Sequence, residues 1–123
     1  MNFYINCNLT NTLVTVTSID NKVVYQISSK SLQSKTKKKN NPHTLRSISY
    51  ILNKLILKNQ PKKNKTNKQP KIQAPINLFF RGFGKGRYHI LKRFNRKKIK
   101  IKLIEDRTFL PFNGCRASKK KRR

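Results

Sequence analysis

The sequence predicts an α/β protein: a small mixed β-sheet covered by two helices, with basic loops and an extended basic C-terminal tail. Six segments lead to this fold class, because runs rich in β-branched and aromatic residues alternate with stretches of helical spacing. Their order is strand, strand, helix, strand, helix, strand. Lysines gather between these segments and at the end of the chain. A chain of 123 residues can bury one modest core.

The first two strands are expected over residues 3–17 and 23–28, where β-branched and aromatic residues are dense. Asp20 and Asn21 separate the two runs, which predicts a β-hairpin. Apolar positions change from odd to even numbers near residues 10–12, so a bulge that switches the buried face is expected there.

The two cysteines are read as separate free thiols. Cys7 alternates with Phe3, Ile5 and Leu9, a pattern typical of an inward-facing strand position. Cys115 lies far along the chain, and the two histidines stand alone, so neither a metal site nor a disulfide is predicted. A reducing compartment follows as the simpler expectation.

The first helix is expected after a basic loop over residues 29–42, which has almost no apolar content. Residues 43–60 then carry apolar side chains at steps of three and four, which predicts an amphipathic helix with Thr44 as its N-cap. Residues 61–75 hold three prolines and five lysines without periodicity, which predicts an extended surface connection.

The second half of the chain begins with a buried strand expected over residues 76–80. The glycine turn "RGFGKGR" follows at residues 81–87. Residues 99–104 alternate isoleucine and lysine, which predicts a strand with one wet face. Between the turn and this strand, a short second helix is marked by Tyr88, Leu91 and Phe94. We therefore expect a single sheet domain over residues 1–112 and a basic tail over residues 113–123.

The charge narrows the choice of partner. Thirty-one lysines and arginines face three acidic side chains, giving a formal net charge of +28. Such a chain needs a polyanion, and no apolar run approaches the length of a membrane span, so nucleic acid is favoured. Three acids are too few for general acid-base catalysis, and no enzyme is predicted. Asp106 is expected to pair with a nearby arginine such as Arg107 or Arg116.

The glycine turn leaves three interpretations open. Three glycines between a strand and a helix let the backbone approach a phosphate closely, and the helix N-terminus supplies donors. The spacing matches neither the dinucleotide fingerprint nor the Walker A motif, although Asp106 stands about twenty residues on, where a ribose-binding acid could lie. A nucleotide cofactor, a purely structural turn and an RNA-phosphate cradle are therefore possible, and the RNA cradle is favoured.

Three stretches together resemble a known family. "NTLVTVTS", "RGFGKGR" and above all "DRTFLPFNGCRASKKKRR" are similar to the universal small-subunit ribosomal protein eleven family, in a bacterial-type, organelle-encoded form. Two positions of the ending depart from the family pattern, since Phe109 replaces a proline and Phe112 replaces a histidine. The glycine-rich stretch that usually follows the second strand contains no glycine here.

The resemblance implies a ribonuclease-H-like sheet without catalytic residues, metal or cofactor, in a structural constituent of the small-subunit platform that supports translation. The implied partners are hairpin loops in the central domain of the small-subunit rRNA, near the mRNA exit path, and ribosomal proteins six, eighteen, seven and twenty-one. Neither a membrane nor a homo-oligomer is implied. From the resemblance and the basic clusters, the expected RNA-binding residues are Asn11, Thr12, Lys35, Lys37, Lys38, Lys39, Arg81, Gly82, Gly84, Lys85, Gly86, Arg87, Asn113, Gly114, Arg116, Lys119, Lys120, Lys121, Arg122 and Arg123.

The compartment is expected to be an organelle. The first residues begin strand alternation at once, without the features of a signal or transit peptide, and the composition suits an AT-rich genome. A mitochondrial ribosome is the expectation and a plastid-type organelle the alternative. A free nucleic-acid-binding protein and a nucleotide-dependent enzyme that uses the glycine turn remain the rival functions.

Overall fold

The computed structural model describes residues 1–32, 40–58, 75–116 and 118–119. Its strands are β1 (Asn2–Cys7), β2 (Thr12–Thr17), β3 (Val23–Ser28), β4 (Ile76–Arg81) and β5 (Ile101–Asp106), and its helices are α1 (Pro42–Lys58) and α2 (Gly86–Arg96). The strands form one sheet in the order β3-β2-β1-β4-β5. The predicted α/β class, with a mixed sheet and two helices, is confirmed.

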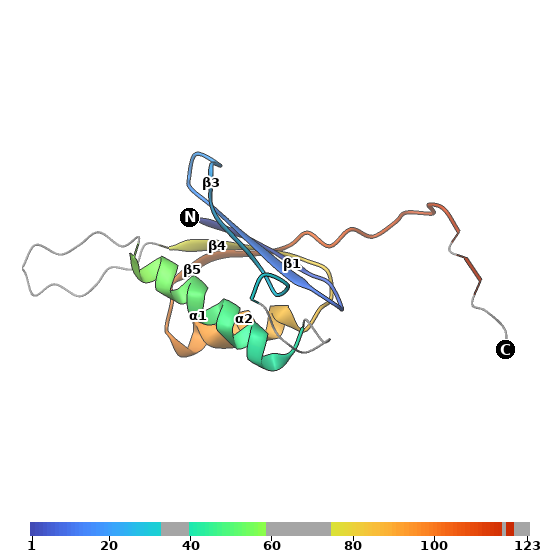
Figure 1. The fold of residues 1–123 in the computed structure, drawn as a ribbon. Helices are drawn as coiled ribbons and strands as arrows, with labels where there is room; N and C mark the ends of the chain where they lie inside the picture. The colour runs from blue at the N-terminus through green and yellow to red at the C-terminus, as the bar shows by residue number, and fades with distance from the viewer. Residues whose placement is uncertain (33–39, 59–74, 117, 120–123) are drawn as a thin grey trace, which may run out of the picture.

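The sheet joins an antiparallel half to a parallel half. β1 pairs antiparallel with β2, and β2 with β3, whereas β4 runs parallel to both β1 and β5. Both helices lie on the same face of the sheet, and the C-terminal segment runs away from this body (Figure 1). In the described part of the chain, neither helix is long and apolar enough to cross a membrane.

The first predicted strand is in fact two strands. The chain reverses between Asn8 and Asn11, where the Asn8 amide donates to the Asn11 carbonyl at 2.9 Å. The odd-to-even change in apolar positions therefore comes from two antiparallel partners that face the same core, and the bulge expected at residues 10–12 is wrong. Leu9 falls in this turn and is 84% exposed, so it does not continue the buried face of β1.

The core fills the space between the helices and one face of the sheet. Phe3 of β1 meets Phe94 of α2 edge to face, with ring centroids 6.1 Å apart. Cys7 is buried and free, as the alternation predicted. The fully buried large side chains are Phe3, Phe94, Ile5, Leu45, Ile48, Leu52, Ile76, Leu78, Ile90, Val14 and Val16.

Helix α1 begins two residues earlier than its predicted cap. Pro42 is the first helical residue, a position where its missing amide hydrogen leaves no bond unmade. The Asn41 carbonyl accepts the first helical hydrogen bond, from the Leu45 amide at 3.1 Å. Thr44 is buried inside the first turn, so its assignment as N-cap is wrong.

Helix α2 is confirmed. Of the three residues that marked it, Phe94 is buried together with Ile90, whereas Tyr88 is 61% exposed. The isoleucine and lysine alternation continues into β5, an edge strand whose side chains are mostly exposed or half-buried. This strand starts at Ile101, and Ile99 before it packs into the core.

Candidate nucleic-acid interface

The glycine turn is packed against the protein's own backbone. Gly82 has a φ of +86°, in the left-handed region that favours glycine, and a Cβ there would lie 2.5 Å from the Cys7 carbonyl oxygen. At Gly84 a Cβ would lie 2.2 Å from the Asn8 carbonyl oxygen. The Gly84 amide also donates to the Cys7 carbonyl at 2.7 Å. These contacts support the structural-turn interpretation for both glycines.

The turn and the β1–β2 connection meet at one end of the sheet. A Cβ on Gly86 would lie 2.5 Å from the Thr12 hydroxyl, so Thr12 and the start of α2 are in close contact. Ser29, at the end of β3, accepts from the Thr12 amide at 2.9 Å and donates to the Asn11 side-chain oxygen. The structure therefore brings Asn11, Thr12 and the glycine turn together, although they lie far apart in the sequence.

Asn40 closes this cluster and was not among the predicted site residues. Its amide nitrogen donates to the carbonyl oxygens of Asn8 and Leu9, at 2.8 and 3.0 Å. Its side-chain oxygen accepts from the Thr12 hydroxyl at 3.0 Å. The sequence signal was its place two residues before Pro42, which starts α1, where a polar side chain can reach back to unpaired backbone groups.

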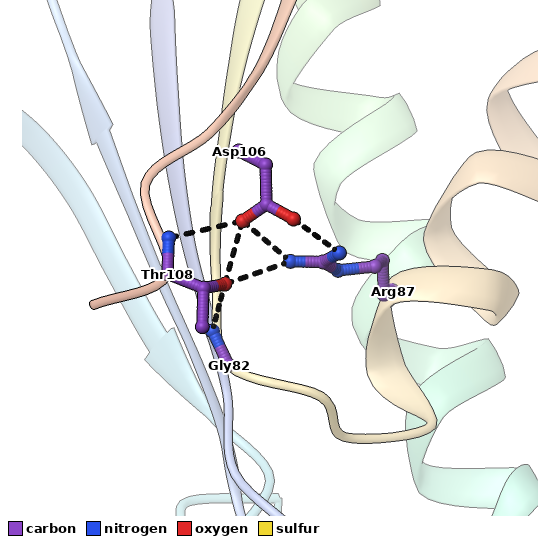
Figure 2. Close-up of polar contacts among 4 residues, drawn as sticks. All are labelled: Gly82, Arg87, Asp106 and Thr108. Carbon is purple, nitrogen blue, oxygen red and sulfur yellow. Dashed lines mark hydrogen bonds and ion pairs between the residues drawn. The ribbon is translucent and has the colours of Figure 1, made fainter. Parts of the chain in front are cut away.

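Arg87 links the turn to the end of β5 (Figure 2). Its guanidinium makes a bidentate contact with Asp106, with nitrogen to oxygen distances of 2.8 and 3.0 Å, and donates to the Thr108 hydroxyl at 3.2 Å. Thr108 also accepts from the Gly82 amide at 3.0 Å and donates its hydroxyl hydrogen to Asp106. The Thr108 hydroxyl thus uses its single donor and both acceptor positions within this network.

This network decides the partner of Asp106. The expectation that Asp106 pairs with Arg107 or Arg116 is wrong. β5 runs parallel beside β4, and this places the Asp106 carboxylate next to the N-terminus of α2. Arg107 pairs instead with Glu105 at 2.8 Å. Arg87 also lies over the Phe80 ring, 5.4 Å from its centroid. Its role in holding β5 to the turn leaves little of its hydrogen-bonding capacity for an RNA phosphate.

The ion pair shifts both titrations. Hydrogen bonds from Arg87 and then from Thr108 hold the pKa of Asp106 well below its usual range. The same contact with Asp106 raises the pKa of Arg87 above its ordinary value. Both groups therefore stay charged over the physiological pH range, so titration does not break the ion pair there.

The predicted cations that remain open to a partner flank the turn and follow it. Arg81 and Lys85 are exposed, and so is Phe83 between them, at 74%. Arg116 and Lys119 lie on the exposed C-terminal segment, as do Asn113 and Gly114. Lys35, Lys37, Lys38, Lys39, Lys120, Lys121, Arg122 and Arg123 lie outside the described residues, as does nearly all of the connection over residues 61–75.

The segment after β5 carries apolar side chains that the protein does not bury. Phe109, Leu110 and Phe112 are 75%, 63% and 94% exposed. Figure 1 shows the C-terminal segment running away from the sheet and the two helices. Three neighbouring exposed apolar side chains form a surface of the kind that partners cover in other proteins.

The sheet face opposite the helices offers a second surface that the sequence did not single out. Tyr4 and Phe79 stack there, with ring centroids 4.9 Å apart, and the Arg107 guanidinium lies 4.1 Å from the centre of the Phe79 ring. Such an aromatic and arginine surface suits a nucleotide base or a protein neighbour. Periodicity alone could not find it, because both residues also fit the predicted strands as ordinary members.

The described part of the chain contains no cluster of side chains suited to hold a metal ion. No group of three or more histidine, cysteine or acidic side chains gathers among these residues. Two of the three acidic side chains of the sequence are engaged in ion pairs. The fold and the site together define the class of protein: a small, strongly basic α/β protein whose charge is complementary to a polyanion.

Comparison with known proteins identifies the family. The family model described as Ribosomal protein S11 matches residues 2–123, and the chain belongs to this family. It is 31% identical to the small ribosomal subunit protein uS11c of Cyanidium caldarium over 118 residues, 96% of this chain and 82% of that protein. It is 30% identical to uS11 of Carsonella ruddii (strain PV) over 119 residues, 97% of this chain and 91% of that protein. Identity to uS11c of Pisum sativum is also 30%, over 97% of this chain and 78% of that protein.

Family membership confirms the resemblance and the absence of an enzymatic role. The family is structural and non-enzymatic, and its members are proteins of the small ribosomal subunit that serve translation. Membership also implies association with small-subunit rRNA and with ribosomal proteins. The nucleotide-dependent enzyme is therefore set aside.

Proposed function

We propose that this protein is an rRNA-binding structural constituent of the small-subunit platform in an organellar ribosome. One observation carries the proposal. The formal net charge is +28, and two of the three acidic side chains are already paired with Arg87 and Arg107. The remaining cations have almost no internal counter-charge, so the phosphates of an RNA partner must neutralise them.

The contacts are assigned to two regions. Arg81 and Lys85 flank the turn and bind phosphates, while the glycines hold that turn against β1 and the β1–β2 connection. The tail over residues 113–123 threads along RNA, and the part over residues 1–112 carries the sheet. The exposed Phe109, Leu110 and Phe112 lie directly before the tail, and a partner that binds the tail can also cover them.

The partners proposed in detail are hairpin loops of the central domain of the small-subunit rRNA, close to the mRNA exit path. Ribosomal proteins six, eighteen, seven and twenty-one are the proposed protein neighbours. The compartment is proposed to be the mitochondrion, with a plastid as the alternative. The matched relatives include chloroplast and bacterial forms, which supports an organellar ribosome in general but does not specifically support the mitochondrion.

Gradient sedimentation of purified mitochondria and plastids tests the assignment. The protein should travel with small-subunit particles in low salt, and protein-to-RNA crosslinking in those particles should recover peptides containing Lys85 and Arg116. A protein that sediments mainly as free monomer in both organelles would contradict the proposal. Recovery with bulk DNA in place of particles would support a free nucleic-acid-binding protein.

The tail has a separate quantitative test. Deleting residues 116–123 removes six cationic side chains. If all six contact single-stranded RNA, the slope of log affinity against log salt should fall by roughly 4 to 5. An unchanged slope would show that the tail stays in solvent in the complex.

A further inference from the structure

A groove between the two helices gathers cations that the predicted interface does not include. It has a volume of about 370 Å³ and is lined by Arg46 of α1 and by Tyr88, His89, Lys92, Arg93 and Arg96 of α2. The two helices pack side by side on one face of the sheet (Figure 1). We call this surface the α1–α2 groove. It lies on elements other than the glycine turn and the tail.

The positive charge of the groove has no internal counter-charge. The sequence contains only three acidic side chains. Glu105 and Asp106 pair with Arg107 and Arg87, and none of these four residues lines the groove. Asp20 sits in the turn between β2 and β3. The groove cations therefore repel one another in the free protein, and an anion from outside would relieve that repulsion.

Two side chains of the groove lie in surroundings that are unfavourable for their positive charge. The Nε of Arg93 is buried and has no hydrogen-bond acceptor within the described residues, which is an unfavourable state for a charged donor. Burial first, and then the charges of Arg46, Lys92 and Lys85, lower the pKa of His89. The groove is thus a site where positive charge is already in excess.

The lining also has the chemistry of a nucleotide site. Tyr88 is 61% exposed, and Lys92 lies over its ring at 5.1 Å from the centroid while donating to its hydroxyl at 2.9 Å. An exposed aromatic ring can stack on a base, and arginine guanidinium groups match the geometry of a phosphate. An acidic protein would use the cations but would leave this aromatic platform without a partner.

We infer that the α1–α2 groove is a second RNA-binding site, which holds a backbone phosphate between Arg46, Lys92 and Arg96 and stacks a base on Tyr88. This inference rests on the proposed rRNA-binding function and adds an independent surface to it. An RNA strand in the groove reaches the helical side of the protein, while the tail engages RNA elsewhere. The protein therefore bridges two RNA segments.

Charge removal at matched positions tests the site. In the full chain, the triple variant Arg46→Gln/Lys92→Gln/Arg96→Gln is compared with Lys22→Gln/Lys54→Gln/Lys102→Gln. All six side chains are exposed, and each variant loses three charges, but none of the control lysines lines the groove. Affinity for a transcript of the small-subunit rRNA is measured over a range of salt concentrations.

The groove variant loses the contact with one phosphate, so its salt slope should fall by roughly 0.7, which corresponds to about fivefold weaker binding at 0.1 M salt. The control should lose much less. If both variants lose the same affinity for the rRNA transcript, the inference is overturned. The same result is expected if the groove binds an acidic protein and not RNA. Failure of the wild-type chain to bind rRNA at all would instead overturn the proposed function.

A spectroscopic readout checks the location of the bound strand. The sequence has two histidines, so labelled histidine gives two ring signals, of which only His89 lines the groove. Adding oligouridylate to the full chain should raise the pKa of His89, because a phosphate offsets the charges of Arg46, Lys85 and Lys92 that now lower it. The ring signal of His43, which is exposed at the first turn of α1 and does not line the groove, is the internal control for a non-specific change in the spectrum. A His89 titration unchanged by the RNA would contradict the groove site.

Discussion

Replacing Gly84 by alanine tests whether the glycine turn is a packed joint between β4, β1 and α2. Gly84 is buried. The cost of replacing it by alanine does not come from an unusual φ, since only Gly82 among the glycines has a positive φ. It comes from contact, because the new Cβ would lie 2.2 Å from the Asn8 carbonyl oxygen and 2.9 Å from the Cys7 carbonyl carbon. Both neighbours are backbone atoms and cannot rotate away.

The magnitude follows from two effects. Forcing a methyl group into a packed site costs about 1 to 3 kcal/mol. Moving the turn outward also weakens the hydrogen bond from the Gly84 amide to the Cys7 carbonyl, which contributes about 1 kcal/mol. The free energy of unfolding should therefore fall by roughly 2 to 4 kcal/mol, and Tm by about 8 to 16 °C for a chain of this size.

Gly114→Ala is the matched control. A Cβ at Gly114 meets only the Pro111 Cβ at 3.5 Å, an ordinary contact. Its free energy of unfolding should stay within about 0.5 kcal/mol of the wild type. Urea unfolding followed by circular dichroism, in enough salt to screen the charge, measures both variants. If Gly84→Ala were as stable as Gly114→Ala, the packed-joint account of the turn would be wrong.

Two further predictions concern titration and thiol reactivity. Because Arg87 lowers the pKa of Asp106, the carboxylate stabilises the fold fully above the unfolded pKa of about 3.9, and this contribution is lost as pH falls below it. Urea midpoints should therefore decline more steeply in acid for the wild type than for Asp106→Asn, and parallel curves would contradict the tie. Burial raises the pKa of Cys7 to about 11, so iodoacetamide near neutral pH should modify the exposed Cys115 and spare Cys7 until urea is added. Equal labelling of both thiols in the folded chain would refute this, and peptide mass spectrometry reads it out.

Local pattern located both helices and the segments that form the sheet, and the errors arose where a pattern had two tertiary explanations. The switch from odd to even apolar positions near Asn11 fits a bulge in one strand or a turn between two antiparallel strands. Only the pairing of β1 with β2 distinguishes them. Likewise, helical spacing located α2 but could not say that Ile90, and not Tyr88, faces the sheet.

The sequence by itself determined the α/β class, the excess of positive charge and the family ending, because composition, periodicity and motif spacing are properties of neighbouring residues. Only the tertiary structure decided that Arg87 holds Asp106, and that Arg46 of α1 faces the cations of α2. Charges reach one another across a fold through strand register and helix packing. Those distances depend on how the whole chain closes around its core, which no local stretch of sequence encodes.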